Sequence, residues 1–183
     1  NSFKNRLSRE GGEDYMSEIP GLDEEIYMFV SSIKDKSPKE KIYAVEKYVR
    51  GIGYYDFENG QVSGMKRGAT TDEMFYVMKN RVESLRDEKG LPETKRFAGV
   101  CDDFSKLTTA ILRKAGLPAG VMTCFRPNPE SKQAVVGDAH AASFVVWPSE
   151  DGKNRIFIVD GTPGGSTLEE QKTLEEMGFA KPT

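Results

Sequence analysis

The stretch Gly99-Val100-Cys101-Asp102-Asp103-Phe104 leads from a glycine loop into a run of residues whose apolar members recur at helical spacing. It predicts a helix that begins at Cys101. The unpaired backbone N–H groups and the positive dipole end at a helix start favour an anion, so a cysteine in the first turn tends to be a nucleophilic thiolate. A nucleophile of this kind needs a base from another part of the chain.

The helix that begins at Cys101 is the most apolar of those the sequence predicts, and it ends at Gly116-Leu117-Pro118. Such a helix belongs in the middle of a domain. Its expected buried stripe consists of Phe104, Leu107, Thr108, Ile111, Leu112 and Ala115. Three further helices are predicted before it, and the first covers residues 22–35. The second starts at the capping sequence Ser37-Pro38-Lys39-Glu40 and ends at Gly51 and Gly53. The third starts at the capping sequence Thr70-Thr71-Asp72-Glu73 and is broken at Gly90.

After Pro118 the pattern changes from helix to strand. Strands are predicted over residues 120–125, 139–147 and 155–159, with a hairpin turn at 150–153, and Ser166 with Glu169 indicates the cap of a short terminal helix. Helices first and strands afterwards predict an α+β domain, with an antiparallel sheet against which the nucleophile helix packs.

The size and charge of the chain bound its function. With 183 residues, 37% of them hydrophobic, it is long enough for one domain, which we place at residues 21–183 after an extended lead-in over 1–20. The net charge of -3 comes without a long run of either sign, so neither nucleic acid nor an anionic membrane is an expected partner. Because the chain begins at Asn1 and not at methionine, we expect either a mature form or an excised piece of a longer protein. An extracytoplasmic or membrane-attached setting is the favoured expectation for that longer protein.

The candidate base is His140, the only histidine in the chain. It stands at the start of the second predicted strand, and Asp160 stands just past the end of the third. Antiparallel strands joined by a hairpin bring the beginning of one beside the end of the other, so His140 and Asp160 are predicted neighbours. If the helix start packs across this edge of the sheet, Cys101, His140 and Asp160 follow one another as thiol, imidazole and carboxylate.

That order corresponds to a known mechanism. The imidazole takes the thiol proton, the thiolate attacks a carbonyl, and the carboxylate fixes the imidazole tautomer. The backbone N–H of Cys101 is one expected oxyanion donor, and Tyr54 and Tyr55 are the first candidates for the second. Those tyrosines belong to an aromatic cluster with Phe57 that either packs a loop on the core or lines a substrate groove.

The residues around these three positions resemble the transglutaminase-like superfamily. Residues 99–105 are similar to its Gly-x-Cys-x-Asp-Phe-Ala segment, His140-Ala141 to its His-Ala segment, Asp160-Gly161-Thr162 to its Asp-x-Thr segment, and residues 113–119 to its Arg-x-x-Gly-Ile-Pro-Ala stretch. The resemblance extends from Ser37 to Pro163 and implies a papain-like cysteine-enzyme core with Cys101, His140 and Asp160 as the catalytic triad. Two positions depart from the family pattern: Ala142 stands where tryptophan is frequent, and Ser105 where alanine is usual.

Several alternatives remain open at this stage. The substrate is expected to be a protein or peptide, and either peptide cleavage or glutamine-to-amine transfer fits the mechanism; a catalytically silent binding or scaffold domain is the rival interpretation. A disulfide between Cys101 and Cys124, the two cysteines, would silence the nucleophile. A zinc site at His140 is disfavoured because the chain has no second histidine and no close cysteine pair, and the mechanism requires no cofactor or metal. Calcium dependence, which some relatives show, is a further alternative, and no oligomeric state is predicted.

Overall fold

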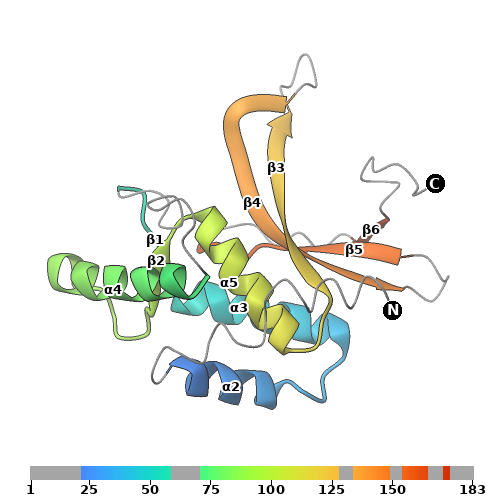
Figure 1. Cartoon of the computed structure of the whole chain (residues 1–183), viewed down its shortest axis with the longest axis horizontal. Coiled ribbons are helices and arrows are strands. Elements are labelled where there is room, and N and C mark those ends of the chain that lie inside the picture. The colour runs from blue at the N-terminus through green and yellow to red at the C-terminus, as the bar shows by residue number, and fades with distance from the viewer. Residues whose placement is uncertain (1–21, 59–70, 128–133, 149–153, 165–170, 174–183) are drawn as a thin grey trace.

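The computed structural model describes residues 22–58, 71–127, 134–148, 154–164 and 171–173 (Figure 1). Its helices are α2 (Leu22–Ser32), α3 (Pro38–Ile52), α4 (Thr71–Lys89) and α5 (Cys101–Lys114), and its strands are β1 (Gly53–Tyr55), β2 (Phe97–Gly99), β3 (Ala119–Pro127), β4 (Ala134–Pro148), β5 (Asn154–Val159) and β6 (Gln171–Thr173). The predicted lead-in over 1–20, the turn at 150–153 and the cap formed by Ser166 and Glu169 lie outside the described residues.

The larger sheet is antiparallel, as the sequence predicts, with strand order β3-β4-β5-β6. Residues 171–173 form its last strand, where the terminal capping sequence had indicated a helix. Figure 1 shows that the hairpin of β3 and β4 projects beyond the helices, while β5 lies along the lower part of β4. His140 lies opposite Cys124 of β3, ahead of the segment Ser143–Pro148 of β4 that pairs with β5.

A second, parallel sheet of two short strands was not predicted. β1 pairs with β2 in the register Gly53 to Phe97 and Tyr55 to Gly99. The sequence had suggested a loop for β1 and a polar connection for β2, because three-residue strands carry almost no periodicity of their own. β2 lies just before Cys101 in the chain, so its pairing with β1 fixes the position at which α5 begins.

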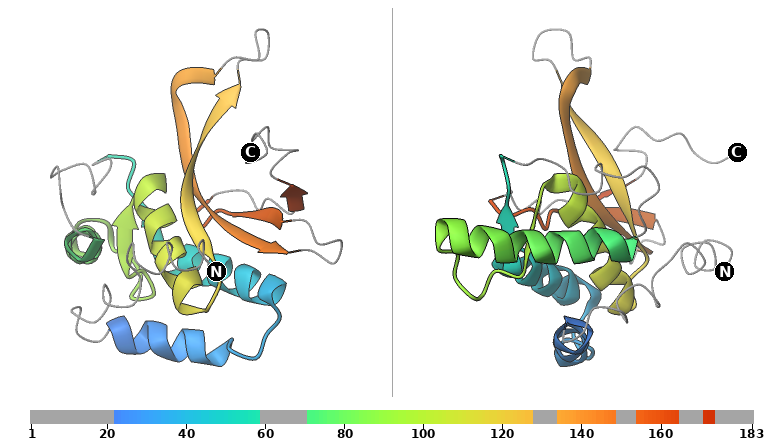
Figure 2. Two further views of the ribbon diagram at one scale, coloured as in Figure 1. Left: turned by 45° about the vertical axis from the view of Figure 1, so that its right-hand side comes forward. Right: turned by 60° about the vertical axis from the view of Figure 1, so that its left-hand side comes forward.

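α5 occupies the middle of the described structure. It contacts α2, α3, α4, β2, β3 and β4, and Figure 2 shows it between the β1–β2 pair and the β3–β4 strands. All six residues of its predicted stripe are buried: Phe104, Leu107, Thr108, Ile111, Leu112 and Ala115. The apolar faces of the surrounding helices meet the same core, so the start of α5 is held in a rigid part of the molecule.

The helices before α5 begin as their sequences predict. Ser37 caps α3: its hydroxyl accepts the Glu40 backbone N–H, and the Glu40 carboxylate accepts the Ser37 backbone N–H at 2.9 Å. α4 ends before Gly90, which has the positive φ of 65° that terminates a helix at low cost.

Within the described residues, no helix combines the length and apolar character needed to cross a bilayer.

Buried hydroxyl groups attach α5 to β4. Ser143 of β4 donates to the backbone carbonyl of Ser105 at 2.8 Å, and Thr109 of α5 lies 3.0 Å from the Ser143 hydroxyl. All three residues are buried, where such bonds resist displacement by water. The N-terminal part of α5, from Ser105 to Thr109, is thereby set in register with the strand that carries His140.

Candidate active site

The turn that presents Cys101 is closed by Asp103. This carboxylate is fully buried, and its Oδ2 accepts the backbone N–H of Val100 at 3.0 Å. A Cβ at position 99 would lie 2.7 Å from the same oxygen, so only glycine there allows Asp103 to reach back. Asp103 therefore has a role in addition to the favourable interaction with the helix dipole expected from its sequence position, because it shapes the entry into α5.

Cys101 is a free, half-buried thiol at the first position of α5. The alternative of a disulfide to Cys124 is therefore wrong in this structure. Its neighbour Asp102 forms an ion pair with Lys106 at 2.6 Å, one helical turn further on. That pairing partly neutralises a carboxylate that would otherwise oppose a thiolate at the helix start.

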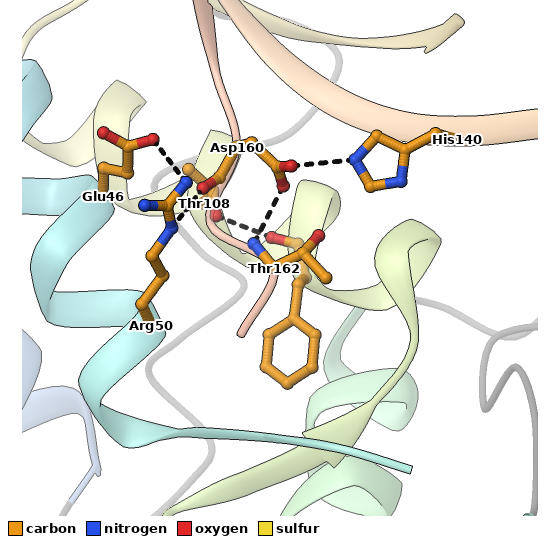
Figure 3. A network of polar contacts seen from close by, with 7 residues as sticks. Glu46, Arg50, Thr108, His140, Asp160 and Thr162 are labelled. Atoms are coloured by element: carbon orange, nitrogen blue, oxygen red, sulfur yellow. Dashed lines mark hydrogen bonds and ion pairs between the residues drawn. The ribbon is translucent and has the colours of Figure 1, made fainter. Parts of the chain in front are cut away.

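His140 and Asp160 are in direct contact, as predicted. Nε2 of His140 lies 2.9 Å from Oδ2 of Asp160, and Oδ1 of Asp160 accepts the backbone N–H of Thr162 at 3.0 Å (Figure 3). The Asp160 side chain is 8% exposed and the His140 side chain 44%. A buried carboxylate with both oxygens engaged is well suited to hold a more exposed imidazole in one orientation.

The contact with Asp160 uses one ring nitrogen of His140 and leaves Nδ1 as the atom for proton exchange with a thiol. Among the described residues, Cys101 and His140 are not joined by a hydrogen bond. The structure thus brings together the imidazole and carboxylate of the predicted triad and leaves the thiol as a separate member. Catalytic hydrogen bonds are often long in structures without substrate and shorten in the complex.

Asp160 reaches this position because Gly161 packs against α5. A Cβ at position 161 would lie 2.0 Å from Oγ1 of Thr108 and 3.1 Å from Cγ1 of Val49. Thr108 is itself held by the bond from its hydroxyl to the Phe104 carbonyl at 2.7 Å. The glycine of the Asp-Gly-Thr segment is therefore a close-approach position that sets the segment against both α5 and α3.

Tyr55 lies beside Cys101. Burial raises the pKa of Tyr55, negative charge at Cys101 raises it further, and the Cys101 backbone N–H acts in the opposite direction. The Tyr55 phenol is therefore near enough to Cys101 for the two groups to interact electrostatically. Because its pKa is raised, the phenol keeps its proton and remains a hydrogen-bond donor at neutral pH.

The two other aromatic residues of this cluster have separate environments. Tyr54 packs on the small apolar cluster of Val82, Leu85 and Ala98, which is a core role. Phe57 is 86% exposed, and its ring centroid lies 4.4 Å from that of Tyr55. The structure thus separates the two oxyanion candidates: Tyr55 interacts electrostatically with Cys101, and Tyr54 packs on the core.

Two charged residues of α3 reach the Asp160 segment, and the sequence analysis did not single them out. Arg50 Nε donates to the Asp160 carbonyl at 2.8 Å, and Arg50 Nη2 pairs with Glu46 Oε1 at 2.8 Å. Burial raises the pKa of Glu46, while Arg50 and a hydrogen bond from the Asp160 backbone lower it. The sequence signal that could have identified Glu46 and Arg50 is their spacing: an acidic and a basic residue four positions apart, next to the apolar stripe of the helix.

No group of three or more histidine, cysteine or acidic side chains within the described ranges could hold a metal ion.

Comparison with known families gives one match. A family model described as the transglutaminase-like superfamily matches residues 27–151, which is more than half of the chain. The match includes Cys101 and His140 and ends before Asp160, whose position beside the imidazole comes from the fold. Comparison with curated proteins and with solved structures finds no match. The chain belongs to the transglutaminase-like superfamily.

Proposed function

We propose that this chain is a cysteine acyl-transfer enzyme that forms a thioester on Cys101 from a peptide or glutamine amide. The observation that carries the proposal is the contact of 2.9 Å between the chain's single histidine and the buried Asp160. A free thiol at the start of the central helix and membership of a superfamily that includes cysteine-dependent enzymes support it.

The acylation step begins with proton transfer. Nδ1 of His140 accepts the thiol proton of Cys101, and the Asp160 carboxylate stabilises the resulting imidazolium. The thiolate then attacks the amide carbonyl carbon, and its electron pair forms the C–S bond. Collapse of the tetrahedral intermediate breaks the C–N bond, and the imidazolium returns its proton to the departing ammonia or amine.

The second step restores the enzyme. Water or an amine adds to the thioester carbonyl, His140 accepts the proton of this nucleophile, and the thiolate of Cys101 leaves. With water the overall reaction is peptide or amide hydrolysis, and with an amine it is transamidation. Both outcomes use the same residues, so the site supports the acyl-transfer class and leaves the acceptor to experiment.

The negative oxygen of the tetrahedral intermediate needs donors close to Cys101. The backbone N–H of Cys101 at the start of α5 is one, and the protonated phenol of Tyr55 is proposed as the second. Asp56, which follows Tyr55, is buried and paired with Arg81 at 2.9 Å, and its N–H donates to the Gly99 carbonyl. These bonds hold the Tyr55 backbone against the strand that leads to Cys101.

The proposal is tested with two assays run side by side: cleavage of a fluorogenic peptide and incorporation of a labelled amine into a glutamine-containing protein. Cys101→Ala is expected to abolish whichever signal the wild-type protein gives. Cys124→Ala is the matched control, because it removes the other cysteine and should retain that signal. Equal signals from the wild type and from Cys101→Ala would contradict an enzymatic role.

A catalytically silent binding module is the second candidate. It is favoured by the lack of a direct hydrogen bond between Cys101 and His140 in the described structure. The rate of Cys101 labelling by iodoacetamide against pH distinguishes the two. Labelling that follows an ordinary thiol, with a midpoint near about 8.5, supports the silent module, and labelling that persists into acid supports the enzyme.

A further inference from the structure

A single ion pair on α3 holds the backbone of Asp160. Arg50 Nε donates to the Asp160 carbonyl at 2.8 Å. Glu46 and Arg50 are joined to each other at 2.8 Å. The backbone carbonyl of Asp160 is therefore bound by Arg50, which is itself held by Glu46, as Figure 3 shows.

This pair lies on the opposite side of Asp160 from the imidazole. Figure 3 shows Glu46 and Arg50 on α3 to one side of Asp160 and His140 on β4 to the other. The Glu46 side chain is 6% exposed and that of Arg50 is 22% exposed. Because the local dielectric is low around side chains this far removed from water, the hydrogen bond from Arg50 to the Asp160 carbonyl is strengthened.

The charges of the pair also matter for His140. The positive charge of Arg50 is balanced by its ion pair with Glu46, which limits its electrostatic attraction for the Asp160 carboxylate. Arg50 then binds the carbonyl oxygen of Asp160, and the carboxylate stays directed at His140 Nε2. Packing of Gly161 against Thr108 and Val49 restrains the following residue in the same way.

We infer that Glu46 and Arg50 are positioning residues, which hold the Asp160 backbone so that its carboxylate fixes the orientation and tautomer of His140. The inference rests on the proposed function for its catalytic meaning. The geometry that it describes exists with or without turnover. It adds a third element, α3, to a site that the sequence motifs place on α5 and the sheet.

The direct test uses the fact that His140 is the only histidine. Nitrogen-15 NMR of the imidazole reports which ring nitrogen carries the proton. The rate at which the Nε2 proton exchanges with water reports how well Asp160 protects that proton. We expect Arg50→Lys and Glu46→Gln to accelerate this exchange by roughly tenfold, the effect of losing one ordinary hydrogen bond, and to increase the Nδ1–H tautomer.

A double-mutant cycle separates positioning from general loss of stability. Each variant is combined with Asp160→Asn, and positioning through Asp160 requires that Arg50→Lys and Glu46→Gln have little further effect in that background. Arg86→Lys is the matched control. Arg86 on α4 also binds a backbone carbonyl, that of Lys95 at 2.8 Å, and a glutamate, Glu83, but it has no contact with Asp160.

The outcomes are distinct from those of the functional proposal. Folded Arg50→Lys and Glu46→Gln proteins with an unchanged imidazole spectrum would overturn the inference, as would an equal change in Arg86→Lys. The rate of iodoacetamide labelling at Cys101, followed by peptide mass spectrometry, is recorded on the same samples. If labelling is unaffected by His140→Ala while the imidazole spectrum responds to Arg50→Lys, the acyl-transfer proposal fails and the positioning inference stands.

Discussion

Oδ2 of Asp160 lies 2.9 Å from Nε2 of His140, although the two residues are 20 positions apart and only one of them lies within a strand. The contact joins a buried carboxylate to a half-exposed imidazole. It also determines which nitrogen of the ring is directed at the carboxylate and which remains for chemistry. The orientation and tautomer that our proposed mechanism requires of His140 depend on this contact.

The first prediction concerns that contact. His140→Ala is expected to reduce the rate of acylation of Cys101 by a factor on the order of 100 to 10,000, the usual contribution of general acid–base catalysis. Asp160→Asn should give a smaller reduction, because the imidazole remains but its tautomer and orientation are no longer fixed. Single-turnover acylation with an activated ester measures both effects. A rate for His140→Ala equal to the wild-type rate would remove His140 from the mechanism.

The sequence predicted the helical part of the fold well because its signals are local. The capping residues Ser37 and Glu40 and the apolar stripe of α5 each lie within a few residues of one another, and the structure confirms them. The neighbourhood of His140 and Asp160 was also predictable, since a hairpin between adjacent antiparallel strands brings their far ends together.

The features that the sequence did not predict depend on contacts between distant segments. β1 and β2 are strands only because Tyr55 pairs with Gly99 across the small sheet, and nothing within either segment indicates that partner. Arg50 was indistinguishable from a surface charge of α3 until the Asp160 segment was placed beside it. Tyr54 and Tyr55 were equal candidates in sequence, and their different neighbours alone distinguish them.

A second prediction follows from that distinction. Tyr55→Phe removes the phenol beside Cys101 and is expected to lower kcat by about 100 to 1,000 fold, the cost of one oxyanion donor. Tyr54→Phe makes the same chemical change one residue away, on the core-facing cluster, and should leave kcat close to the wild-type value. Steady-state kinetics of the two variants provide the comparison. Equal losses would indicate that the phenol stabilises the fold and does not stabilise the oxyanion.

A third prediction concerns pH and Glu46. Burial raises the pKa of Glu46 above its ordinary value of 4.5. At pH values between 4.5 and the raised pKa, Glu46 is still protonated in the folded protein but has lost its proton in the unfolded chain. The stabilisation from this proton is therefore fully present below 4.5 and is lost as pH rises through the raised value. Urea unfolding at several pH values should show this slope for the wild type and not for Glu46→Gln.

Glu40 provides a control of opposite sign. Its hydrogen bonds with the side chain and backbone of Ser37 lower the pKa of Glu40 below 4.5. Its stabilising effect is therefore present above 4.5 and lost as pH falls through the lowered value. The difference in unfolding free energy between the wild type and Glu40→Gln should thus grow as pH rises. If the unfolding free energies of Glu40→Gln and Glu46→Gln had the same dependence on pH, neither pKa shift would control the pH dependence of stability.

The last prediction concerns the close approach of Gly161 to α5. Gly161→Ala places a methyl group 2.0 Å from Oγ1 of Thr108, so we expect a loss of about 1 to 3 kcal/mol in unfolding free energy and slower acylation as Asp160 is displaced. Thr108→Ala removes that oxygen and should restore part of both losses in the double variant. Gly51→Ala, with nothing within 4 Å of the added atom, should leave acylation unchanged. Because the predicted displacement acts through Asp160, a Gly161→Ala protein that loses stability but acylates Cys101 at the wild-type rate would show that the segment's fit against α5 is not required for catalysis.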